Sequence, residues 1–280
     1  MDLPERWICS GNDYRRLPDE IIEMGMKAFV NEDMFEKAFD ILYEDESPQL
    51  IRLPLMDNLE AIAYGGILSV VSNMYIVKEY NYKRLDELDI KAGDLVKTDE
   101  IKCVLEYIRK NKDKNIMLDI EGPFSIIAGL IRSEMLFMCQ RKGQDVLRDK
   151  LFMIADDLVV YAKEAIEAGV RLISFSDPQS SIDMVGQNFY NEFCGAAIMR
   201  FLKGIEPYLD NAVLHVCGKT SFGLLKSGMA EQQTVRINSG DYRNTLFNIA
   251  QDADFRIIGN ACINDSRKSG EYVNKLILKD

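Results

Sequence analysis

The sequence predicts an α/β fold in which short strands alternate with longer amphipathic helices along most of the chain. Apolar runs predict strands at Leu50–Leu55, Asn115–Ile120, Arg171–Phe175, Ala212–Cys217, Thr234–Ile237 and Phe255–Gly259. Helical periodicity separates them, as at Thr98–Lys110, Asp149–Gly169 and Asn188–Leu209. A strand followed by a helix and another strand indicates parallel pairing with right-handed crossovers. This pattern fits both a closed barrel and an open doubly wound sheet.

The first 48 residues are predicted to form a helical cap. Between Met26 and Glu44, six apolar residues recur on one broad helical stripe: Phe29, Met34, Phe35, Ala38, Phe39 and Leu42. No internal repeat or low-complexity linker divides the rest, and 280 residues suit a single α/β barrel. We therefore expect one domain over residues 1–280, with its cap at residues 1–48.

Composition excludes several classes of function. The formal net charge is −11, which argues against binding to nucleic acid or to an anionic membrane surface. The first sixteen residues lack an apolar signal region, and no apolar run reaches membrane-spanning length. A cytoplasmic protein is expected, with its six cysteines reduced. No strand is followed by a glycine-rich nucleotide-binding motif.

His215 is the only histidine, and it lies two residues before Cys217 in a predicted strand. Residues at this spacing project from the same face of a strand. Gly218 follows at the strand end, where parallel barrels build their active sites. An imidazole and a thiol side by side make half of a zinc site. The alternative is a hydrogen-bonded core histidine beside a buried cysteine.

Further candidates also lie near strand ends. Cys262 follows the last predicted strand and would supply a third zinc ligand, leaving the fourth position open for catalysis; packing behind that strand is its alternative. Glu121 and Asp177 are candidates to line the site, with helix or loop capping as the alternative for Asp177. Glu192 lies on a predicted helix, and we expect its carboxylate to be solvated.

Several segments together resemble the uroporphyrinogen decarboxylase superfamily, and especially its methylcobamide:coenzyme M methyltransferase branch. They are Glu121-Gly-Pro-Phe-Ser125, Phe175-Ser-Asp-Pro178, Tyr190-Asn-Glu-Phe193, His215-Val-Cys-Gly218 and Ile258-Gly-Asn260. Their order along the chain matches the family order. The resemblance implies a (β/α)8 TIM-type barrel. Because only 18 residues follow Cys262, one β/α unit near the C-terminus is expected to be shortened.

The resemblance implies a methyltransferase in which His215, Cys217 and Cys262 bind Zn²⁺. The zinc would activate a thiol acceptor such as coenzyme M, which then takes a methyl group from a corrinoid (methylcobalamin) on a partner protein. Related enzymes use acidic and histidine ligands to cleave methyl ethers, and Asp177, Glu192 and His215 would supply that set. The direction of transfer thus stays open. Family barrels are often dimeric, so a homodimer is also an expectation.

Two other functions remain as alternatives. A tetrapyrrole decarboxylase would need an Arg-rich N-terminal substrate loop, and Arg15 and Arg16 are the nearest basic pair, without the surrounding family pattern. A family member without catalytic activity, which only binds a corrinoid or a partner, would suit a barrel that lacks one unit.

Overall fold

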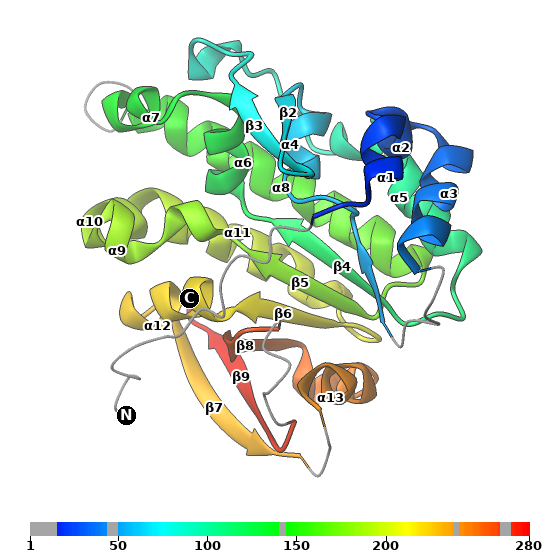
Figure 1. Ribbon diagram of the computed structural model, residues 1–280. Coiled ribbons are helices and arrows are strands. Elements are labelled where there is room, and N and C mark those ends of the chain that lie inside the picture. Colours follow the sequence, from blue (N-terminus) through cyan, green and yellow to red (C-terminus); the bar gives the residue numbers. More distant parts are fainter. Residues whose placement is uncertain (1–15, 44–49, 140–143, 238–240, 264–269) are drawn as a thin grey trace.

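The computed structural model of the chain describes residues 16–43, 50–139, 144–237, 241–263 and 270–280. Its central feature is a seven-stranded sheet in the order β1-β4-β5-β6-β8-β9-β7 (Figure 1). The strands are β1 (Ile51–Leu53), β4 (Ile116–Glu121), β5 (Leu172–Ser176), β6 (Val213–Cys217), β8 (Ile257–Ala261), β9 (Tyr272–Leu278) and β7 (Ala230–Arg236). The first five in this order pair in parallel. The α/β prediction is therefore confirmed.

Most of the helices lie between the strands along the chain. The longer ones are α3 (Glu32–Tyr43), α5 (Asp99–Lys110), α6 (Pro123–Leu130), α8 (Gln144–Ala168), α11 (Gly195–Ile205), α12 (Gly218–Lys226) and α13 (Tyr242–Ile249). Shorter ones are α1 (Asp19–Met24), α2 (Lys27–Val30), α4 (Leu59–Ala63), α7 (Ser133–Cys139), α9 (Ile182–Val185) and α10 (Gln187–Phe189), the last running into the π-helical turn η4 (Tyr190–Cys194).

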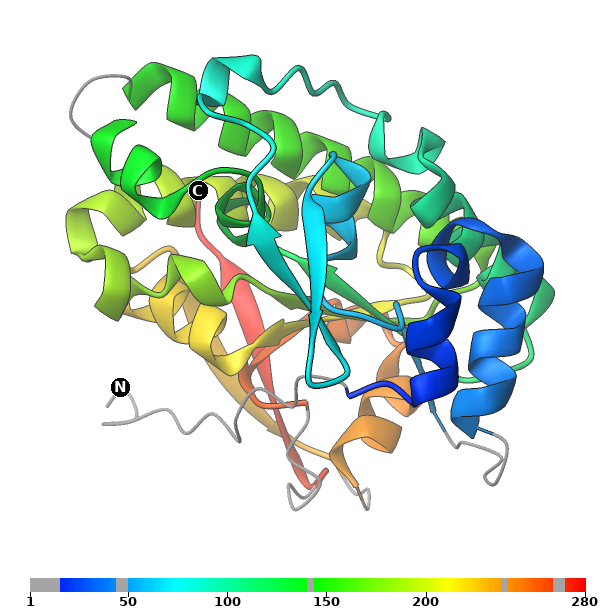
Figure 2. The same cartoon turned by 45° about the horizontal axis from the view of Figure 1, so that its top comes forward.

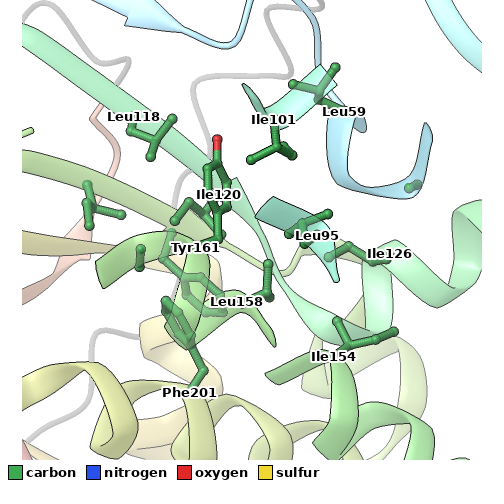
Figure 3. Close-up of a cluster of buried hydrophobic side chains, with 14 of the residues drawn as sticks. Leu59, Leu95, Ile101, Leu118, Ile120, Ile126, Ile154, Leu158, Tyr161 and Phe201 are labelled. Carbon is green, nitrogen blue, oxygen red and sulfur yellow. The ribbon is translucent and has the colours of Figure 1, made fainter. Parts of the chain in front are cut away.

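Helix α5 shows how the sequence specifies these elements. Thr98 caps its N-terminus, and Asp99 and Arg109 place charges of favourable sign at its two ends. Its buried residues Ile101, Val104, Leu105 and Ile108 follow helical spacing. That stripe packs into the main core, which Figure 3 shows between α5, α8 and β4.

The two faces of the sheet carry separate apolar clusters. Leu118, Ile173 and Leu214 point into the main core with α5, α8 and α11. Their strand neighbours Met117, Leu172 and Val213 point to the opposite face and pack against α13. Because side chains alternate along a strand, His215 shares the α13 face with Val213. This second face, hereafter the inner face, carries the polar residues of the candidate site.

The predicted barrel closure is not confirmed. Among the described strands, β1 pairs only with β4, and β7 pairs only with β9. The prediction that all strands run parallel is wrong for Thr234–Ile237, because β7 pairs antiparallel with β9. Strand β9 also runs antiparallel to β8, so it ends the parallel series where another β/α unit was expected.

The N-terminal helices pack beside the sheet, against α5. Phe39 of α3 stacks on Tyr107 of α5 with ring centroids 4.4 Å apart, and Figures 1 and 2 show α1 to α3 grouped next to that helix. Residues 1–15 and 44–49, which belong to the predicted cap, lie outside the described residues. A separate hairpin of β2 (Ile67–Val71) and β3 (Met74–Glu79) crosses the front of the molecule in Figure 2.

Candidate functional site

The sequence-predicted residues gather at one edge of the sheet. Parallel strands end at the same edge, and in open or closed α/β sheets ligands bind there. Glu121 ends β4, Asp177 follows β5, Cys217 ends β6 and Cys262 follows β8. The exception is Glu192 in η4, whose carboxylate lies 2.8 Å from the guanidinium of Arg148 on α8.

His215 lies on the inner face, one row before this edge. Its Cα pairs with Ser174 of β5 on one side and Ile258 of β8 on the other. The side chain is fully buried, and its ring meets Tyr242 of α13 edge to face, with centroids 5.8 Å apart. Helix α13 thus closes the inner face around the imidazole, and the histidine is held in one place.

Cys217 is half-buried and belongs to the same face as His215, two residues further along β6. Its partner in β8 is Ala261, across an irregularity in the β6–β8 register, and Cys262 comes directly after that partner. Burial raises the pKa of the Tyr242 phenol, and the charge of a thiolate at Cys262 adds to that shift; the Tyr242 ring also contacts His215. The three predicted zinc ligands therefore lie on, or directly after, two adjacent strands.

No three histidine, cysteine or carboxylate side chains in the described ranges are grouped closely enough to hold a metal ion. Even so, the donor set suits zinc: one imidazole and two thiols are zinc ligands, and their strands are hydrogen-bonded neighbours.

Asp177 is 1% exposed and binds the N-terminus of helix α6. One carboxylate oxygen accepts hydrogen bonds from the Ser125 N–H at 2.9 Å and the Ser125 hydroxyl at 2.6 Å, and the other accepts from the Phe124 N–H at 3.2 Å. Burial nevertheless raises the pKa of Asp177 to about 6. Both oxygens thus have partners, but Asp177 caps α6, which precedes it by about 50 residues, and its side chain does not cap the helix that follows it, as the alternative had it.

Close packing explains the glycine of the Glu-Gly-Pro-Phe segment. A Cβ atom on Gly122 would lie 2.3 Å from the Cβ of Asp177, so no larger residue fits while Asp177 caps α6. Pro123 begins that helix, a position where its missing N–H costs nothing.

Glu121 is half-buried and lies beside a buried carboxyl group, Glu60, which was not predicted from the sequence. The Glu121 N–H donates to the Glu60 carboxylate at 3.3 Å. Burial raises the pKa of Glu60 to about 7, and burial together with the charges of Glu60 and Asp177 raises the pKa of Glu121 well above its ordinary value. The signal for Glu60 was its place just after the first strand; it was missed because it lies inside an apolar helix.

An ion pair on the inner face was not predicted from the sequence either. Arg52 of β1 bonds to the carboxylate of Asp119 in β4, and Asp119 pairs in register with Ser174, the neighbour of His215. The alternation of Asp119 and Glu121 along one strand was the available signal. A polar row therefore crosses three strands, from Asp119 through Ser174 to His215.

The chain resembles known methyltransferases in sequence and in fold. It is 26% identical over 213 residues to the methylcobamide:CoM methyltransferase MtaA of Methanosarcina barkeri, covering 73% of this chain and 62% of that protein. It is 26% identical over 183 residues to MtbA of Methanosarcina mazei, a protein of the same description, covering 63% and 54%. The chain thus spans less than two thirds of the length of these relatives.

Comparison with solved structures also finds a methyltransferase. A solved methyltransferase from Methanosarcina mazei superposes with a TM-score of 0.61 at 18% identity, over 91% of this chain and 78% of the other. No helix among the described residues is both long and apolar enough to cross a membrane. The sequence model of the uroporphyrinogen decarboxylase (URO-D) family matches residues 62–262, a span that contains Glu121, Asp177, His215, Cys217 and Cys262. The chain belongs to the uroporphyrinogen decarboxylase family.

Proposed function

We propose that this protein is a methyltransferase that moves a methyl group between a protein-bound corrinoid and a small substrate, with a thiol such as coenzyme M as acceptor. The observation that carries the proposal is the arrangement of His215, Cys217 and Cys262 at the carboxyl ends of β6 and β8. The relatives named methylcobamide:CoM methyltransferase support the reaction class.

Within this proposal, His215, Cys217 and Cys262 hold Zn²⁺. Zinc bound there supplies Lewis acidity, which lowers the pKa of a bound thiol. The chain itself supplies the rest: α13 fixes the imidazole through Tyr242, and the surrounding apolar cluster excludes water from that side. The remaining side of the site opens at the strand ends, where a small thiol and a corrinoid carrier would approach. An eight-stranded barrel and a homodimer remain predictions.

The thiol-acceptor direction is preferred to methyl-ether cleavage because of the partners of the two acidic candidates. Ether cleavage would use Asp177 and Glu192 beside His215 as ligands. In the structure Asp177 caps α6, and Glu192 pairs with Arg148. The cysteine set needs neither carboxylate.

Metal content tests the proposal. Protein purified without a chelator should contain about one zinc per chain, as expected for a three-ligand catalytic site. His215→Ala should lose the zinc and the methyl transfer together, and Cys262→Ser should lose or weaken zinc binding. Stoichiometric zinc retained by His215→Ala would overturn the ligand assignment. Zinc unaffected in Cys262→Ser would move the third ligand to a carboxylate and favour the ether-cleaving reaction.

A further inference from the structure

A buried carboxyl group and a half-buried one lie next to each other where β1 and β4 end. Glu60, on α4, is 2% exposed, and Glu121 ends β4. The Glu60 carboxylate accepts the Glu121 N–H. The Asn58 amide lies against the other carboxylate, and the orientation that satisfies both groups places Nδ2 3.2 and 3.3 Å from the Glu121 oxygens. Two like charges in such a place repel, so one shared proton is favoured over two full charges.

A buried tyrosine packs against β4 from the main-core face, the side to which Ile120 points. The Tyr161 side chain is fully buried on α8, and its hydroxyl finds no hydrogen-bond partner among the residues that the structure describes. Figure 3 shows its ring directed at β4 beside Ile120. Burial raises the pKa of Tyr161 well above its ordinary value, and the charges of Glu60 and Asp119 add to that shift. An unsatisfied buried hydroxyl is costly, so this one favours a bound water.

We infer that Glu60 and Glu121 hold one proton between them and receive the proton that a thiol substrate loses during methyl transfer. The inference rests on the proposed function. In that reaction the S–H bond breaks and an S–C bond forms, while the Co–C bond breaks with its electron pair left on cobalt. One proton is released for each methyl group transferred, and it needs an acceptor near the sulfur.

The position of Glu121 suits this acceptor. Glu121 pairs in register with Ser176 of β5, and the next strand is β6, which ends at Cys217. Two strand spacings separate the backbones of Glu121 and Cys217, about 10 Å, which leaves room for a small thiol between their side chains. A carboxyl group whose pKa is raised is a stronger base than an ordinary carboxylate. Glu121 would be the catalytic residue and Glu60 a positioning residue.

The charges around Glu60 and Glu121 favour a proton bound to this pair. Asp57 and Asp119 raise the pKa of Glu60, and Asp177 raises that of Glu121. The cation on this side is Arg52, which bonds to Asp119. Tyr161 is neutral. Among the side chains that shift these two pKa values, the pair therefore faces more negative than positive charge, which favours a bound proton.

Infrared spectroscopy of the wild-type protein tests the shared proton without any methyl transfer. We expect the carbonyl band of a protonated carboxylic acid at pH 7, lost in Glu60→Gln and in Glu121→Gln. Glu164→Gln is the matched control, because that carboxylate is 40% exposed near Arg109, and it should keep the band. The absence of a band at pH 7 in the wild type would overturn the inference.

Methyl transfer from methylcobalamin to a thiol tests the acceptor role. Glu121→Gln should slow the reaction about 100-fold at pH 7, the order expected for a lost general base. The deficit should shrink as pH rises, because the free thiol then ionises unaided. Glu60→Gln should move the acid limb of the rate profile to lower pH, since removing its charge lowers the pKa of Glu121.

The results of these experiments distinguish a failure of the proton-acceptor role from a failure of the proposed function. A loss in Glu121→Gln that is equal at all pH values would indicate a structural role and overturn the inference while leaving the proposed function intact. A wild-type protein that shows the infrared band but transfers no methyl group would overturn the proposed function and, with it, the acceptor role.

Discussion

At the scale of single residues, Asp177 shows a buried carboxylate engaged in structure. Its three hydrogen bonds from Phe124 and Ser125 compensate for burial and attach β5 to helix α6. Since β4 runs directly into α6, Asp177 also fixes the end of the strand that carries Glu121. The residue thus orders the site whether or not it touches a substrate.

Removing this cap should therefore destabilise the protein. Asp177→Ala leaves the Phe124 and Ser125 N–H groups without their acceptor, and we expect a loss of about 2–3 kcal/mol in the free energy of unfolding. Asp183→Ala is the control, because Asp183 forms an exposed pair with Lys226 and should cost under about 0.5 kcal/mol. Chemical denaturation measures both. Equal losses in the two variants would contradict the capping role.

Glu60 makes stability depend on pH in a defined direction. Its pKa in the folded protein is about 7, above the ordinary value of 4.5. A raised carboxyl pKa contributes stability that is fully present below the unfolded pKa and is lost as pH rises through the folded pKa. Wild-type stability from this group should therefore fall between about pH 4.5 and pH 8.

Glu60→Gln should remove this dependence. Glutamine keeps the shape and an oxygen that accepts the Glu121 N–H, but it never ionises. We expect the variant to be more stable than the wild type by roughly 1–3 kcal/mol at pH 8, and little different at pH 4.5. Denaturation midpoints of the wild type and the variant at the two pH values measure this difference in stability. A variant less stable than the wild type at pH 8 would show that Glu60 is stabilised as an anion.

The sequence predicted the positions of the site residues better than their contacts. His215, Cys217, Asp177 and Glu121 were found because each stands near a strand end, which local pattern reveals. Partners distant in sequence were not found: the Glu60–Glu121 contact joins residues 61 positions apart. Such contacts depend on the order of strands in the sheet, which no local pattern specifies.

At the scale of elements, five predicted strands occur close to their predicted bounds because each is an apolar run buried on both faces. Strand β9 was not predicted, since Asn274 and Lys275 interrupt its apolar residues. The β2–β3 hairpin was also missed. Its turn at Ser72 and Asn73 has positive φ at both residues, which a hairpin needs, but the usual glycine signal is absent.

Helix α13 is the element that covers the inner face beneath His215. Leu246→Ala should therefore cost about 2–5 kcal/mol of stability, because Leu246 is fully buried among Met117, Leu172 and Val213. It should also weaken zinc binding by loosening the support of the imidazole. Ile277→Ala on β9 removes an apolar side chain that is 48% exposed, and it should change neither property appreciably. A destabilised Leu246→Ala protein with unchanged zinc affinity would show that α13 does not support the zinc site.

At the scale of the whole molecule, the fold brings together four strand ends that carry the candidate chemistry, although the described strands do not close into a barrel. The same edge carries two distinct groupings: thiols and an imidazole at β6 and β8, and carboxyl groups at β1, β4 and β5. Their separation across the sheet suits a reaction that needs both a metal-activated thiol and a proton acceptor.

The central claim is that the His215, Cys217 and Cys262 set supports methyl transfer between a corrinoid and a thiol. The most direct measurement follows the absorbance of methylcobalamin mixed with coenzyme M and zinc-loaded protein under anaerobic conditions. We predict that the wild type converts methylcobalamin to its demethylated form and yields the methyl thioether, and that Cys217→Ser does so at least about 100-fold more slowly. Demethylation at the same rate with the wild type, Cys217→Ser and no protein would contradict the claim.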